Sequence, residues 1–176
     1  WTIACGIALV SLGNLPLRDF DEGTVARVAY EFSRADRNNL FLPTIWGGEY
    51  INKPPGLHWL IASVINFVHL LDPLRSEELP AEWVIRFAPA LISTLVVPFG
   101  GLIQWHLRKG DRLAALVTSG ILLTLMPIAR HGRLAMLDGS QLSAIALFWL
   151  FLVAIDESSM DSWKAFGAGL AATSML

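Results

Sequence analysis

The sequence predicts an all-α protein, a polytopic bundle of transmembrane helices. Of its 176 residues, 54% are hydrophobic and only 16% are charged, whereas soluble domains carry about 25% charged residues. The apolar residues lie in long runs without strict alternation, which favours helices over the strands of a membrane barrel. The formal net charge of −2 gives no indication of a nucleic-acid partner.

Six apolar segments indicate a single membrane domain over residues 1–176. In chain order they cover about 1–17, 56–71, 84–107, 113–130, 139–155 and 164–176. The first and last are shorter than the roughly 20 residues that a spanning helix needs. Each is therefore expected to be part of a span, in a chain that is a fragment of a larger protein. A signal-peptide remnant is the alternative for the first segment, although neither a basic region nor a cleavage site accompanies it.

Residues 18–83 are predicted to form a loop with two helices at the membrane surface. Along the first, about 22–35, apolar residues recur at the spacing of one helix face: Val25, Val28, Ala29 and Phe32. Arg27 and Glu31 lie four residues apart on the opposite face, where they can form an ion pair. Asp21 is expected to be the N-cap of this helix. An amphipathic helix of this kind lies along a membrane surface rather than across it.

The second surface helix is predicted over 56–71. It is short for a span, and it contains His58, Asn66 and His69. If it does not cross the membrane, the two following spans bring Asp21 and the turn at 131–138 to the same side. If it crosses, the two lie on opposite sides. Basic residues occur in loops on both sides of the predicted spans, so charge bias alone does not decide which side is cytoplasmic.

Two neighbouring carboxylates, Asp21 and Glu22, open the first surface helix. A favourable interaction with the helix dipole is one explanation of the pair. The other is a carboxylate that removes a proton from an acceptor or holds a metal ion. The two explanations are compatible, because a carboxylate at a helix terminus is also well fixed.

Three further charged residues are candidates for a site. Lys53 precedes Pro54 and is held extended by it, which suits a contact with an anionic headgroup or phosphate. A lysine that simply reaches water is the alternative. Arg133 and Asp138 lie between two apolar segments, where they could anchor or cap helix ends, pair with each other, or mark a functional site.

Four motifs, in this order, resemble the membrane-embedded glycosyltransferases of the GT-C superfamily. They read "RDFDEGTVARVAYEF", "LFLPTIWGGEYINKPPGLHWL", "IRFAPAL" and "RLAMLD", and the likeness spans residues 15 to about 155. The closest likeness is to family 39, which includes dolichyl-phosphate-mannose protein mannosyltransferases and the bacterial aminoarabinose transferases that modify lipid A.

The resemblance implies roles for five residues. Asp21 matches the first-loop aspartate that activates the acceptor, Glu22 completes the acidic pair, and Asp138 matches an acidic position in the next extracytoplasmic turn. These three are the expected catalytic residues. Lys53 matches the lysine before proline that contacts the donor phosphate, and Arg133 matches a basic residue upstream of Asp138, so both are expected to bind the donor.

The resemblance further implies an inverting transfer of a hexosyl or pentosyl group from a polyprenyl-phosphate donor to a lipid, glycan or protein acceptor. The reaction is expected at the extracytoplasmic face of the bacterial inner membrane, with no certain cofactor, although a divalent metal is possible. The sugar, the acceptor and the oligomeric state stay open. The alternative is a transporter or channel segment that uses the acidic and arginine residues to carry ions or protons.

Overall fold

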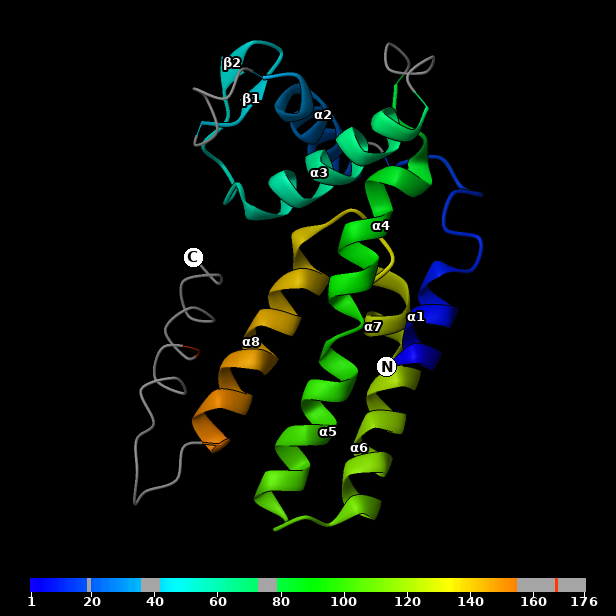
Figure 1. Cartoon of the computed structure of the whole chain (residues 1–176), viewed down its shortest axis with the longest axis vertical. Helices are drawn as coiled ribbons and strands as arrows, with labels where there is room; N and C mark the ends of the chain where they lie inside the picture. The colour runs from blue at the N-terminus through cyan, green and yellow to red at the C-terminus, as the bar shows by residue number, and fades with distance from the viewer. Residues whose placement is uncertain (19, 36–41, 73–78, 155–166, 168–176) are drawn as a thin grey trace.

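A computed structural model of the chain describes residues 1–18, 20–35, 42–72, 79–154 and 167. The elements form an elongated helix bundle and, at one end of it, a smaller part that we call the cap (Figure 1). The bundle consists of α1 (Thr2–Leu9), α4 (Glu82–Ser93), α5 (Val96–Leu107), α6 (Arg112–Thr124), α7 (Met126–His131) and α8 (Leu137–Ala154). The cap consists of α2 (Asp21–Arg34), α3 (Gly56–Leu71) and an antiparallel hairpin of β1 (Thr44–Ile45) and β2 (Gly48–Glu49). The segment predicted over 164–176 lies outside the described residues, apart from Gly167.

The helix predicted over about 22–35 is confirmed as α2. Its predicted apolar face is buried, as expected: Val25, Val28, Ala29 and Phe32. The expected ion pair between Arg27 and Glu31 is also confirmed, at 2.7 Å. The expected N-cap is wrong, because Asp21 is the first residue of the helix and Phe20, with a φ of 73°, holds the capping position. The backbone bond that opens the helix runs from the Thr24 amide to the Phe20 carbonyl, at 3.1 Å. The Glu22 carboxylate, and not that of Asp21, accepts the Arg18 amide that precedes the helix.

Helix α3 begins and ends at the residues that the sequence predicts. It packs against α2 and α4 and lies across the end of the bundle rather than alongside α5 and α6 (Figure 1). Its buried face joins a core shared by three helices and one turn residue: Val25, Ala29, Leu57, Ile61, Ile65, Val84, Ile85, Ala88 and Ala135. Because Ala135 lies just before α8, the loop that carries Asp21 and the turn at 131–138 lie at the same end of the bundle.

Within the described residues, two helices are long and apolar enough to cross a membrane, Glu82–Leu107 and Leu137–Ala154. They correspond to the spans predicted over 84–107 and 139–155. The prediction of one helix over 113–130 is wrong, because α6 ends at Thr124 and α7 begins at Met126. The break has a local cause. Pro127 has no amide hydrogen, and its ring would clash with a carbonyl of the preceding helical turn.

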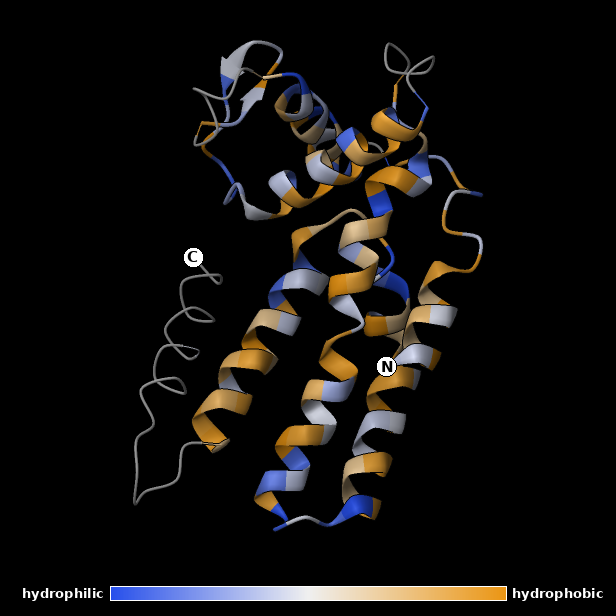
Figure 2. Ribbon diagram, in the orientation of Figure 1, coloured by the Kyte–Doolittle hydropathy of each residue, from blue (hydrophilic) through white to orange (hydrophobic). Residues whose placement is uncertain are grey.

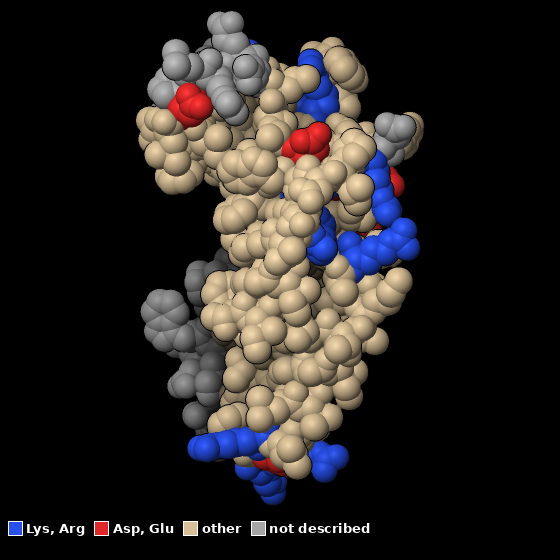
Figure 3. Space-filling view, turned by 90° about the vertical axis from the view of Figure 1, so that its right-hand side faces the viewer, with Lys and Arg blue, Asp and Glu red and all other residues tan. Residues whose placement is uncertain are grey.

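The middle of the bundle has an apolar, uncharged surface, whereas the two ends of the molecule carry charged residues. The bundle helices are largely hydrophobic, whereas the cap is more hydrophilic (Figure 2). On the face in Figure 3, Lys, Arg, Asp and Glu gather over the upper part and at the lower end, with none between. The lower group comes from the α5–α6 turn: Arg108, Lys109, Asp111 and Arg112. An uncharged belt between two charged ends is the surface expected of a membrane-spanning bundle.

Helices α5 and α6 approach closely at a glycine. A Cβ on Gly101 would overlap the Ser119 hydroxyl oxygen and lie 3.2 Å from the Ala115 carbonyl oxygen. We therefore expect Gly101→Val to lower the free energy of unfolding by about 1–3 kcal/mol through overpacking, measured as a lower unfolding temperature in detergent. Gly120→Ala on α6 is the control, because a Cβ there meets nothing within 4 Å. Equal effects of the two variants would contradict close packing at Gly101.

Candidate functional site

A buried carboxylate lies at the junction of the cap and the bundle. Glu22 has no exposed surface. Its Oε1 accepts from the Arg86 Nε and from the Ala135 amide, both at 2.8 Å. Its Oε2 accepts from the Arg86 Nη2 at 2.8 Å and from the Arg18 amide at 2.9 Å. Burial raises the pKa of Glu22, but these hydrogen bonds outweigh burial and hold that pKa below its usual value. Both oxygens are therefore occupied, and neither faces solvent.

Arg86 uses its remaining donors to hold the chain that leads into α2. Its Nη1 donates to the carbonyls of Leu12 at 3.0 Å and Leu15 at 2.7 Å, and its Nη2 donates to the carbonyl of Pro16 at 2.9 Å. Together with Glu22, these contacts form what we call the Glu22–Arg86 clamp. The sequence prediction gave Arg86 no role. The signal was available, because an arginine inside a predicted span is costly unless it is fully paired.

Asp21 differs sharply from its neighbour. Its side chain is exposed, and no hydrogen bond or ion pair to it occurs in the part of the chain that the structure describes. The clamp fixes the first turn of α2 through Glu22, so the backbone of Asp21 is held while its carboxylate faces outward. Of the two acidic residues, Asp21 is therefore the one that can meet a solvent-borne or membrane-borne molecule.

Arg133 lies in the tightly packed turn between α7 and α8, and Asp138 follows this turn at the start of α8. The Ser93 hydroxyl of α4 donates to the Gly132 carbonyl at 2.5 Å, and a Cβ on Gly139 would lie 2.9 Å from the Ser93 Cβ. Asp138 is exposed in the first turn of α8 and lines a cavity of about 120 Å³. Arg133 donates to the carbonyl of Val10. Among the described residues no ion pair joins Arg133 to Asp138.

Glu31 organises the hairpin that leads to Lys53. Its carboxylate accepts from the Thr44 hydroxyl and the Trp46 amide, both at 2.8 Å, and from the Gly47 amide at 3.5 Å. Trp46 and Gly47 both have positive φ, 55° and 77°, which is the conformation of a two-residue hairpin turn. The sequence identified Glu31 only as an ion-pair partner. Its hydrogen bonds to the hairpin turn could not be predicted, because the apolar periodicity of α2 gives no information about the hairpin residues.

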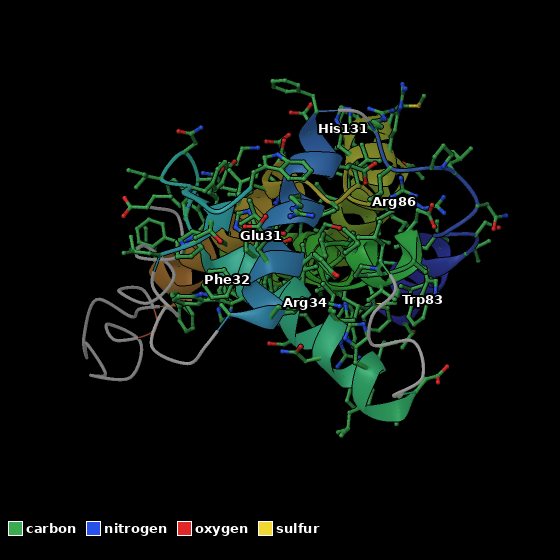
Figure 4. All side chains as sticks on the ribbon, turned by 90° about the horizontal axis from the view of Figure 1, so that it is seen from above. Glu31, Phe32, Arg34, Trp83, Arg86 and His131 are labelled. Atoms are coloured by element: carbon green, nitrogen blue, oxygen red, sulfur yellow. The ribbon has the colours of Figure 1, made fainter. Side chains whose placement is uncertain are left out.

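Lys53 lies between β2 and α3 and is half-buried. It forms no hydrogen bond or ion pair with the residues that the structure describes, so its ammonium group is available to an anion. Figure 4 looks onto the cap from above and labels Glu31 on α2, Arg86 on α4 and His131 at the end of α7. The described ranges contain no group of three or more His, Cys, Asp or Glu side chains that could hold a metal ion.

The predicted site residues lie toward one end of the molecule without forming a contact cluster. The bond between Glu22 and the Ala135 amide joins the helix of Asp21 to the turn that precedes Asp138. Lys53 leads into α3, which packs on α2. Across the described residues, no hydrogen bond or ion pair links Asp21, Lys53 and Asp138 directly. A shared pocket for these three side chains stays a prediction.

No protein-family model and no curated protein matches the sequence. Two solved structures match the fold, and both are of ArnT from Cupriavidus metallidurans, one bound to undecaprenyl phosphate and one in the apo state. Their TM-scores are 0.75 and 0.74 at 20% sequence identity, and each match covers 97% of this chain. The chain spans 29% of the length of ArnT. It therefore has the fold of a part of ArnT.

Proposed function

We propose that this chain is part of an integral-membrane glycosyltransferase that takes a sugar from a polyprenyl-phosphate donor. The observation that carries the proposal is the fold of ArnT over 97% of the chain. The four motifs that resemble family 39 give separate support from the sequence. ArnT is a lipid A aminoarabinose transferase and binds undecaprenyl phosphate, which supports the same class of lipid carrier here. The activity belongs to the full-length protein, because the chain spans 29% of ArnT.

The cap is proposed to lie at the extracytoplasmic surface of the membrane. The family resemblance implies this side. The α5–α6 turn at the opposite end carries Arg108, Lys109 and Arg112, which is compatible with the cytoplasmic side, but the cap carries positive residues as well, so charge bias does not decide the orientation. Helix α3 leaves large apolar side chains exposed: Trp59, Leu60, Phe67, Leu70 and Leu71. A helix with such a face at the end of the uncharged belt is suited to the membrane surface. The phosphate of a lipid carrier lies at the same level, because its tail is in the bilayer.

The charged residues supply the two functions that an inverting transfer needs. Asp21, exposed and without a bond in the described chain, is the proposed base that takes a proton from the acceptor hydroxyl or amine. Lys53, with no ion pair there, is proposed to stabilise the departing phosphate. Arg133 and Asp138 are the proposed second basic and second acidic residues of the site. Glu22 is proposed to position Asp21 rather than to react, because both of its oxygens are occupied.

The proposal is tested by incubating the full-length protein, in lipid vesicles, with a panel of radiolabelled undecaprenyl-phosphate sugars. The expected result is that one donor is consumed, that undecaprenyl phosphate accumulates, and that label appears in an acceptor fraction. A transporter or channel would instead move ions across the vesicle membrane without consuming any donor. Ion flux with every donor intact would overturn the proposal.

A further inference from the structure

His58 in α3 is a buried polar residue that the proposed chemistry does not use. Its side chain has no exposed surface, and its Nδ1 lies 3.3 Å from the Pro54 carbonyl oxygen. A carbonyl oxygen only accepts hydrogen bonds, so the Nδ1 carries the proton and the Nε2 carries a lone pair. Tyr50 packs edge-on against the ring, with 5.9 Å between ring centroids. The Nε2 is buried and has no hydrogen-bond partner within the described structure.

Packing alone does not account for a histidine at this position. A buried nitrogen without a partner is unfavourable, and an apolar ring of similar size would avoid that penalty. Burial lowers the pKa of His58 to about 4, the bond to Pro54 opposes this change, and the Lys53 charge lowers the pKa further. The imidazole is therefore neutral at pH 7. What the histidine provides is one directed hydrogen bond, from the Nδ1 to the Pro54 carbonyl.

That hydrogen bond stabilises the turn at Pro54 and Pro55, which has few other hydrogen bonds available to it. Pro54 and Pro55 have no amide hydrogen, so neither can donate a backbone hydrogen bond that would hold the turn. Their carbonyls are the available groups. The Pro55 carbonyl accepts the Trp59 amide at 3.0 Å, and the Pro54 carbonyl is held by His58. Lys53 directly precedes this pair and shares its backbone.

We infer that His58 is a positioning residue that anchors the turn at Lys53 onto α3 and so directs the Lys53 ammonium group to the donor phosphate. The inference rests on the proposed function, because the phosphate contact that His58 supports is the one assigned there to Lys53. His58 itself touches no reacting atom. Its contribution should therefore appear in the affinity for the phosphate of the lipid carrier, and not in the proton transfer at the acceptor.

Two substitutions separate the two nitrogens of His58. Asn places an amide nitrogen near the position of the Nδ1, whereas Gln reaches toward the Nε2. We would measure binding of undecaprenyl phosphate to the purified full-length protein in detergent, with undecaprenol as the ligand that lacks the phosphate. His58→Asn is expected to bind like the wild type. His58→Gln and Lys53→Ala are each expected to bind undecaprenyl phosphate about tenfold more weakly, and binding of undecaprenol should be the same in all four proteins.

The outcomes distinguish this inference from the function on which it rests. If Lys53→Ala weakens binding while His58→Gln equals His58→Asn, the inference is overturned and the proposed function stands. If the wild type binds undecaprenyl phosphate no better than undecaprenol, the proposed function fails. The unfolding temperatures of His58→Asn and His58→Gln are measured in parallel. If the loss of affinity in these two variants is proportional to their loss of stability, His58 has only a structural role. If the Gln variant does not fold, His58→Leu replaces it, because Leu also lacks a donor near the Nδ1.

Discussion

Replacing Asp21 by Asn in the full-length protein is expected to slow sugar transfer by about 10²- to 10⁴-fold, the range that a general base contributes. Asn keeps the size of the side chain but cannot take a proton from the acceptor at neutral pH. Asp21 is exposed and forms no capping hydrogen bond within the described residues, so the variant should lose no more than the contribution of one charge at a helix N-terminus, about 0.3–1 kcal/mol. The measurement is the initial rate of label transfer from donor to acceptor in vesicles, at matched protein content.

Asp111→Asn is the matched control for this variant. Asp111 caps α6 at the opposite end of the bundle, where its Oδ1 accepts from the amides of Leu113 at 3.0 Å and Ala114 at 3.1 Å. Asn caps helices about as well as Asp, so this variant should keep both its stability and its transfer rate. Transfer at the wild-type rate by Asp21→Asn would remove Asp21 from the role of base.

The largest loss of stability is expected from Arg86→Met. This change leaves Glu22 as a buried charge without its partner, and it frees the carbonyls that Arg86 holds at Leu12, Leu15 and Pro16. Removing one partner of a buried ion pair lowers the free energy of unfolding by about 3–5 kcal/mol. The measurement is the unfolding temperature of the full-length protein in detergent. Transfer should fall as well, because the first turn of α2 is no longer fixed.

Two further variants test the origin of that loss. Arg108→Met changes an exposed arginine in the α5–α6 turn and is expected to alter the free energy of unfolding by less than about 0.5 kcal/mol. Adding Glu22→Leu to Arg86→Met removes the unpaired charge, and the double variant is expected to be more stable than Arg86→Met alone. If Arg86→Met were no less stable than Arg108→Met, the clamp would have no energetic role.

Periodicity and proline placement were enough to predict the helices of the cap. The spacing of Val25, Val28 and Phe32 located α2, and the residues after Pro55 gave α3 its bounds. The same reasoning did not separate Asp21 from Glu22, because both acids precede the first apolar residue of the pattern. The signal was present, since Glu22 lies three and seven residues before Val25 and Ala29 and so belongs to their buried face.

The partners of Glu22 could not be predicted from local pattern. Arg86 is 64 positions away and the Ala135 amide is 113 positions away. A backbone amide donor cannot be recognised from the sequence, because nearly every residue type has one. The break at Leu125 is a different case. Pro127 was visible inside an apolar run, but the prediction of one continuous helix considered only apolarity. Proline disrupts the helical turn that precedes it, and the helix is therefore divided into α6 and α7.

The distance along the chain between Glu22 and its partners also has a consequence for biogenesis. Glu22 leaves the ribosome 64 residues before Arg86 and 113 residues before Ala135. Until both have emerged, the carboxylate keeps its hydration shell, because burial without these donors is unfavourable. The cap therefore closes only after the hairpin of α5 and α6 has been synthesised. An unfinished chain therefore leaves its first acidic loop unpacked, and Asp21, the proposed base, is fixed in place only when the turn ahead of α8 has been made.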